Sequence, residues 1–144
     1  MSSIKEEERL PITALRWKPC GGKSSSVLTS ICADGNICVW HSTSQKILHI
    51  NKTPSGCDLY ALDYSVDGST YAAAGKSYAV YIYDDVTQKL IRELKTEAID
   101  VVGHSNRIHS LKFTDNPNLL LSGSWDSTIK IWDLKSRIFH KQKI

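Results

Sequence analysis

Three residues whose side chains could form a hydrolytic triad occur in the last third of the sequence. They are His104, Ser122 and Asp126. A serine hydroxyl activated by a histidine, which a carboxylate in turn orients, is the constellation of nucleophilic acyl transfer. A nucleophile also needs exposure, an oxyanion site and room for a substrate, and the sequence indicates none of these. We therefore expect these residues to be structural and the chain not to be an enzyme.

Two further patterns could carry chemistry but are incomplete. Gly22-Lys23-Ser24 and Gly75-Lys76-Ser77 look like the end of a phosphate-binding loop. Such a loop needs another glycine five residues before its last one, where this sequence has Trp17 and Thr70. Nucleotide binding is therefore not expected.

The cysteines do not form a metal-binding pattern. They show no Cys-x-x-Cys spacing and no paired histidines nearby, so a zinc site is not expected. We predict no cofactor and no metal. The four residues are Cys20, Cys32, Cys38 and Cys57.

Composition and charge place the chain among soluble globular proteins. It has 144 residues, of which 41% are hydrophobic and 23% charged. The formal net charge of +3 is too small to imply a nucleic-acid partner. No apolar run reaches the roughly 18 residues that span a membrane, and the polar start lacks the apolar core of a secretion signal. A cytoplasmic or nuclear location without membrane contact is expected.

The elements that must position these residues occur three times. Each repeat holds short segments rich in β-branched and aromatic residues, separated by turn residues such as Asp34-Gly35-Asn36. No helical period is sustained. The aligned segments are Ile12–Trp17, Val27–Ser30 and Ala33–Trp40, then Leu59–Tyr64, Tyr71–Ala74 and Tyr78–Asp84, then Ile108–Phe113, Leu119–Ser122 and Ser127–Asp133.

Each repeat also carries a fourth short run, which gives four strands per repeat. These runs are Lys46–Ile50, Lys89–Leu94 and Arg137–His140. The polar stretch Lys95 to Asp100 is expected to be a loop insertion. Four short strands in each repeat predict an all-β chain of small antiparallel sheets.

The third repeat carries a specific resemblance. Gly103-His104, followed by Leu121-Ser-Gly-Ser-Trp-Asp-Ser-Thr-Ile-Lys-Ile-Trp-Asp133, is similar to the WD-repeat family in order and spacing. The resemblance covers about residues 10–144. It implies a β-propeller arc of three four-stranded antiparallel blades that forms part of a larger closed propeller. The expected divisions are a polar tail at 1–9, blades at 10–53 and 103–144, and a degenerate blade with the insertion at 54–102.

The resemblance also assigns the triad-like residues a role. In this family they join Trp132 in a buried hydrogen-bonded tetrad of His104, Ser122, Asp126 and Trp132. A histidine can bridge a carboxylate and a hydroxyl, and the hydroxyl can accept from the indole N–H. Repeat one retains Ser30, Asp34 and Trp40 but has Glu8 at the histidine position.

Repeat two departs furthest from this pattern. The four corresponding residues are Ser55, Ala73, Ser77 and Tyr83. Because it lacks the tetrad, we expect this repeat to depend most on its neighbours. A His104→Ala change should therefore cost more stability than a change at Ser55.

Three repeats leave an open arc, because propellers need at least about four blades to close. Both end faces should then expose the apolar surface that neighbouring blades cover. We expect the chain to be part of a longer propeller, or to be completed by a second chain.

The function that this resemblance implies is a non-catalytic scaffold that binds other proteins. The alternative is a substrate-recognition subunit of a larger enzyme complex, such as a ubiquitin ligase or a chromatin modifier. Candidate contacts lie at one rim, where Trp125 precedes the tetrad aspartate; its alternative role is to pack against its own turn. The other candidates, whose alternative role is that of plain surface residues, are Arg107, Asn106, Asp58 and Tyr60.

Overall fold

The computed structural model describes residues 10–23, 25–97, 102–136 and 139–143. Strands are the regular elements over these ranges, and none of the described residues forms a helix able to cross a membrane. The strands are β1 (Ile12–Trp17), β2 (Val27–Cys32), β3 (Asn36–His41), β4 (Lys46–Lys52), β5 (Leu59–Tyr64), β6 (Thr70–Gly75), β7 (Val80–Asp84), β8 (Leu90–Leu94), β9 (Ile108–Phe113), β10 (Leu119–Ser124), β11 (Thr128–Asp133) and β12 (Phe139–Lys143).

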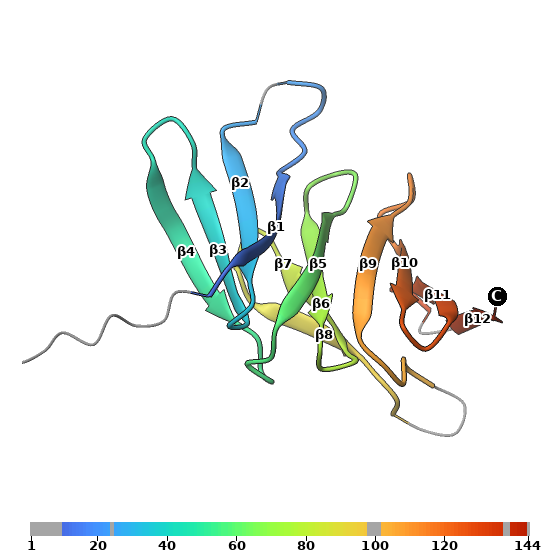
Figure 1. Cartoon of the computed structure of the whole chain (residues 1–144). Coiled ribbons are helices and arrows are strands. Elements are labelled where there is room, and N and C mark those ends of the chain that lie inside the picture. The colour runs from blue at the N-terminus through green and yellow to red at the C-terminus, as the bar shows by residue number, and fades with distance from the viewer. Residues whose placement is uncertain (1–9, 24, 98–101, 137–138, 144) are drawn as a thin grey trace, which may run out of the picture.

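These strands form three separate four-stranded antiparallel sheets, which confirms the predicted all-β fold. Sheet 1 contains β1 to β4, sheet 2 contains β5 to β8, and sheet 3 contains β9 to β12, each in chain order. Figure 1 shows the sheets side by side as an arc. The first strands line its inner side, since β1 packs beside β5 and β5 beside β9.

The predicted fourth strands differ slightly from the observed ones. The first extends to Lys52, and the second begins at Leu90. The third is Phe139–Lys143, where the sequence predicted Arg137–His140. Residues 137 and 138 lie outside the described residues, as do 98–101 in the proposed insertion.

A tight turn between β2 and β3 illustrates how the sequence sets the sheet edges. Gly35 has φ +82°, and a Cβ atom there would lie 2.9 Å from the carbonyl carbon of Gly56. Only glycine combines this backbone angle with so close an approach. The turn therefore brings the edge of sheet 1 against the segment that leads into sheet 2.

The core lies between neighbouring sheets. One cluster joins sheets 2 and 3, with Ile82, Leu111 and Trp132 among its members. A second joins sheets 1 and 2, with Ile31 and Tyr71 among its members. Sheet 2 is consequently covered on both faces, and each sheet buries the apolar side chains that its alternating strand pattern presents.

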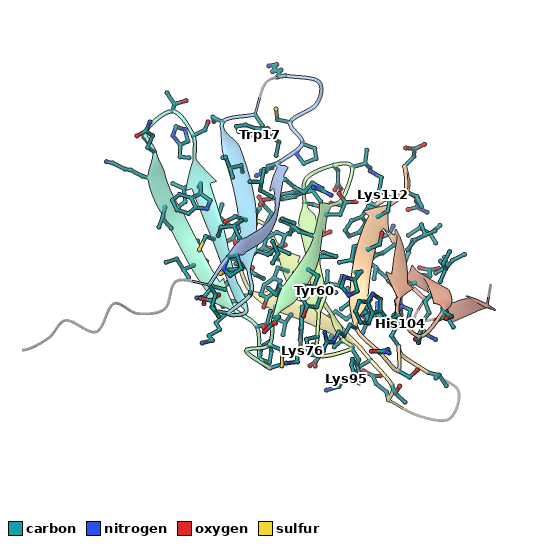
Figure 2. All side chains as sticks on the ribbon, viewed as in Figure 1. Trp17, Tyr60, Lys76, Lys95, His104 and Lys112 are labelled. Atoms are coloured by element: carbon teal, nitrogen blue, oxygen red, sulfur yellow. The ribbon has the colours of Figure 1, made fainter. Side chains whose placement is uncertain are left out.

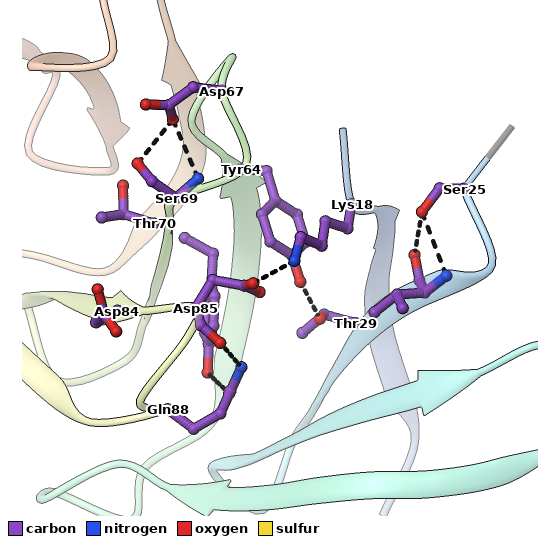
Figure 3. Close-up of polar contacts among 12 residues, drawn as sticks. Lys18, Ser25, Thr29, Tyr64, Asp67, Ser69, Thr70, Asp84, Asp85 and Gln88 are labelled. Carbon is purple, nitrogen blue, oxygen red and sulfur yellow. Dashed lines mark hydrogen bonds and ion pairs between the residues drawn. The ribbon is translucent and has the colours of Figure 1, made fainter. Parts of the chain in front are cut away.

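A polar seam fastens sheets 1 and 2 at the edge opposite the Gly35 turn (Figure 3). Lys18 forms an ion pair with the buried Asp85. The hydroxyls of Thr29 and Tyr64 are 2.6 Å apart, and burial raises the pKa of Tyr64 to about 12. Because buried polar groups that are paired specify one arrangement, this seam fixes how the two sheets meet.

The two end faces of the arc expose apolar side chains, as expected for three sheets. On sheet 1, Leu15 and Trp17 are each 54% exposed. On sheet 3, Ile129 is exposed beside a shallow hollow of about 260 Å³ that reaches Gly123. In sheet 1 the positions of Ile129 and Gly123 are occupied by Ile37 and Ile31, which are both buried between sheets.

Candidate functional site

The triad-like residues form one continuous hydrogen-bonded chain in sheet 3. The Nδ1 atom of His104 is 2.8 Å from a carboxylate oxygen of Asp126, and its Nε2 atom is 2.6 Å from the Ser122 hydroxyl. The indole N–H of Trp132 donates to the same hydroxyl at 2.8 Å. The histidine precedes β9, the serine lies on β10, and the tryptophan lies on β11. The chain therefore ties three segments of one sheet together.

The directions in which the pKa values of His104 and Asp126 are shifted indicate which atoms of this hydrogen-bonded network carry protons. Burial lowers the pKa of His104 and outweighs the opposing effect of Asp126, so the imidazole is neutral. Burial alone would raise the pKa of Asp126, but hydrogen bonds from Thr128, Ser105 and His104 hold it well below its usual range. A neutral imidazole has one N–H, which donates to the carboxylate, and its other nitrogen accepts from the serine.

The geometry of this network does not expose the Ser122 hydroxyl to solvent, as a nucleophile would require. Ser122 is 1% exposed and its hydroxyl oxygen is already engaged by Trp132 and His104. Such an arrangement can fasten strands, and a substrate could not reach it without opening the sheet.

Sheet 1 repeats only part of this hydrogen-bonded network. The indole N–H of Trp40 donates to the Ser30 hydroxyl at 2.9 Å. The carboxylate of Asp34 instead accepts from the backbone and side-chain nitrogens of Asn36, at 2.9 and 2.6 Å. It therefore shapes its own turn. Glu8, at the histidine position, lies outside the described residues.

Sheet 2, whose residues do not form the tetrad, contains a different network at the same place. The Tyr81 hydroxyl donates to Ser55 at 2.9 Å and lies 2.8 Å from the Ser77 hydroxyl. Tyr81 stands opposite Ala73 in the β6–β7 ladder. Since Ala73 and Ser55 are smaller than the serine and histidine of sheet 3, the tyrosine ring fills the space and its hydroxyl bridges the two remaining polar groups.

The candidate contact residues gather at the edge that carries the turns between second and third strands, which we call the rim. Trp125 lies in the β10–β11 turn and is 61% exposed. Its backbone N–H donates to the carbonyl of Arg107 at 3.0 Å. The Arg107 guanidinium carbon lies 5.5 Å from the centre of the indole, which is cation–π range.

His109 joins these residues into a stack that the sequence interpretation missed. Its ring lies 4.8 Å from that of Trp125, with 16° between the planes. On its other side it lies 4.7 Å from Tyr60, with only 2° between the planes. We call Tyr60, His109, Trp125 and Arg107 the rim stack. His109 and Tyr60 are the second residues of β9 and β5, and this shared repeat position was the available signal.

Two other candidates play smaller parts. Asp58 accepts a hydrogen bond from the Tyr60 hydroxyl at 3.3 Å and so borders the rim stack. The Asn106 side chain accepts from the backbone N–H of Arg107 at 2.8 Å, which caps the start of β9 instead of joining the stack. Figure 2 shows Tyr60 and His104 at this edge, together with Lys76 and Lys95. Within the described ranges, no three histidine, cysteine or acidic side chains come together as metal ligands.

Known proteins resemble this chain in sequence and in fold. The family model described as WD domain, G-beta repeat, matches residues 92–133. WD repeat-containing protein 89 homolog from Dictyostelium discoideum is 42% identical over 77 residues, which is 54% of this chain and 20% of that protein. U3 small nucleolar RNA-associated protein 21 homolog from Schizosaccharomyces pombe is 30% identical over 108 residues, 75% of this chain and 11% of that protein. The chain thus spans about a fifth or less of these relatives.

A solved structure shares the arrangement of the sheets. The crystal structure of RRP9 WD40 repeats superposes with a TM-score of 0.81 at 21% identity. The match covers 94% of this chain and 39% of that one. The three sheets therefore share their fold with part of a longer chain of WD40 repeats.

Proposed function

Because this chain belongs to the WD-repeat β-propeller family, we propose that it is a non-catalytic scaffold that binds other proteins through the rim stack. Members of this fold share an architecture whose turns and strand ends form binding surfaces. The rim stack supplies the surface in this chain, while the buried tetrad of sheet 3 holds the turn that presents it.

The observation that carries this proposal is the exposure of a rigid aromatic group. Trp125 is 61% exposed yet held by His109 and by the backbone of Arg107. Tryptophan, tyrosine and arginine are the residue types that dominate the binding energy of protein interfaces. A side chain that is ordered before binding loses less conformational entropy when a partner arrives.

Of the two compartments expected from the sequence, the relatives favour the nucleus. The relative from Schizosaccharomyces pombe is named for its association with U3 small nucleolar RNA. A tagged copy of this chain should therefore accumulate in the nucleus, and fluorescence imaging tests this directly.

The experiment compares proteins captured by the chain and by matched variants. A double variant with Trp125→Ala and Arg107→Ala removes both ends of the exposed pair. The control is Lys112→Ala, which alters an exposed residue of β9 at the opposite edge (Figure 2). Quantitative mass spectrometry should show proteins that the control retains and the rim variant loses, with circular dichroism verifying that both fold. An unchanged set of captured proteins in the folded rim variant would refute the proposal.

A further inference from the structure

Two cations of the rim, Arg107 and Lys76, have no ion-paired side chain among the described residues. Within the described ranges, the guanidinium of Arg107 faces the Trp125 indole and has no hydrogen-bonded or ion-paired side chain. The exposed Lys76, whose backbone N–H donates to Asp58 at 2.9 Å, likewise has no ion pair among these residues. A guanidinium carries five N–H donors, so Arg107 retains most of its capacity to bind an anion.

Three carboxylates of the same edge already accept hydrogen bonds or an ion pair. Asp58 accepts from Tyr60, and Glu93 pairs with Lys95 at 3.3 Å. Asp126 is bound by His104 and by the backbone N–H of Ser105 at 3.0 Å. Arg107 and Lys76 therefore keep N–H donors that no described side chain occupies, and these donors complement a negatively charged ligand.

The position of Arg107 relative to Trp125 adds a shape requirement. A carboxylate can accept two parallel N–H donors from a guanidinium. A flat side chain next to that carboxylate can then pack on the exposed indole, as aromatic groups do at 4.5–7 Å centroid separation. From these contacts we propose that the rim stack binds an acidic peptide segment, with a carboxylate on Arg107 and a neighbouring flat apolar side chain on Trp125. This partner chemistry rests on the function proposed above.

Single-stranded nucleic acid also offers negative charge and flat rings. It carries a phosphate at every nucleotide, and proteins that bind it track the backbone with a positively charged groove. Over the described residues the rim offers two cations without an ion pair, Arg107 and Lys76, and two cations make a point of contact but not a continuous groove for a backbone. The observations therefore favour the peptide.

The test measures binding of short labelled probes to the whole 144-residue chain by fluorescence anisotropy. One peptide carries Asp-Trp-Glu between glycine and serine residues, and its counterpart carries Lys-Trp-Lys. The third probe is an oligouridylate of similar length. We expect the acidic peptide to bind about tenfold or more tightly than the lysine peptide at low salt. Arg107→Glu should reverse this preference and Trp125→Ala should weaken both peptides.

Two variants guard against a general charge effect or loss of the fold. Lys112→Glu makes the same change of charge on the same strand at the far edge and should leave the preference intact. Arg107→Gln removes the charge without reversing it and should abolish the preference, with circular dichroism establishing that each variant is folded.

The outcomes separate this inference from the proposed function. Equal or tighter binding of the lysine peptide or of oligouridylate to the wild-type chain would overturn the acidic-peptide assignment, as would an equal effect of Lys112→Glu. If the acidic peptide fails while the Trp125 and Arg107 double variant still loses captured proteins, the scaffold function stands and only the partner chemistry is wrong.

Discussion

The hydroxyl of Tyr81 donates a hydrogen bond to Ser55 at 2.9 Å. In sheet 2 this tyrosine therefore makes a link at the rim where sheet 3 uses the histidine His104. Two residues further along β7, the Tyr83 hydroxyl is buried and has no hydrogen-bond partner among the described residues. Tyr81→Phe should lower the free energy of unfolding by about 1 kcal/mol, because it removes the hydrogen bonds that join Tyr81 to Ser55 and Ser77. Tyr83→Phe should be neutral or slightly stabilising, because it removes an unpaired group.

Urea unfolding of the two variants measures this contrast. They share the same chemical change on one strand, so each is the control for the other. Equal losses of stability would show that the hydrogen bonds of Tyr81 have no special importance in sheet 2.

The tetrad of sheet 3 should contribute more stability than the network of sheet 2. His104→Ala removes the acceptor of the buried Ser122 hydroxyl and one hydrogen bond of Asp126, and it opens a cavity, at a cost of about 2–4 kcal/mol. Ser55→Ala removes one acceptor of Tyr81 and should cost about 1 kcal/mol. Thermal unfolding of both variants tests the order, and equal shifts in Tm would contradict it.

Stability should fall as the pH is lowered. The pKa of His104 is lowered in the folded state, so the unfolded chain takes up a proton first as the pH drops below the ordinary value of 6.5. The pKa of Asp126 is also lowered, and its contribution is present above the ordinary value of 3.8 and is lost as the pH falls below it. The free energy of unfolding should therefore decrease first from neutral pH into the mildly acidic range, then further in strong acid.

A variant without the titrating imidazole separates these two effects. His104→Gln should show a shallower decrease between about pH 7 and pH 5 than the wild-type chain, since each group contributes only where its folded and unfolded protonation differ. Denaturant titrations at a series of pH values provide the measurement. Identical slopes in both proteins would mean that His104 is not the group responsible.

Two glycines at comparable rim positions should respond differently to the same change. A Cβ atom on Gly75 would lie 2.0 Å from the carbonyl oxygen of Asp58, whereas one on Gly123 would meet only the Cβ of Ser110, at 3.5 Å. Gly75→Ala should cost about 1–3 kcal/mol through overpacking, and it displaces the segment that carries Tyr60. Gly123→Ala should be neutral or stabilising, because alanine loses less entropy in a strand. Urea unfolding decides, and a larger loss for Gly123→Ala would contradict the described packing.

Much of the fold was predictable because its signals are local and repeated. The Asp34-Gly35-Asn36 turn and the alternating strands set the sheet edges without long-range information. The residues of the sheet 3 tetrad could be named because their order matched a known repeat, and the structure joins all four in one chain of hydrogen bonds.

The network of sheet 2 and the rim stack depend on contacts that the alignment does not display. Tyr81 occupies the position that is Lys130 in sheet 3, so comparing tetrad positions alone could not reveal that its hydroxyl reaches Ser55. His109 contacts Tyr60 across the boundary between two sheets. Such a contact requires the spacing of the arc, which no single repeat encodes.

Site-specific photocrosslinking tests the central claim, that the rim stack is the surface for other proteins, most directly. A benzoylphenylalanine placed at Trp125 should form covalent adducts with other proteins in cells. The same group placed at Val66, which is 50% exposed in the turn at the opposite edge, should not. Adducts at position 66 equal to those at 125, or none at 125 in the folded protein, would contradict the account.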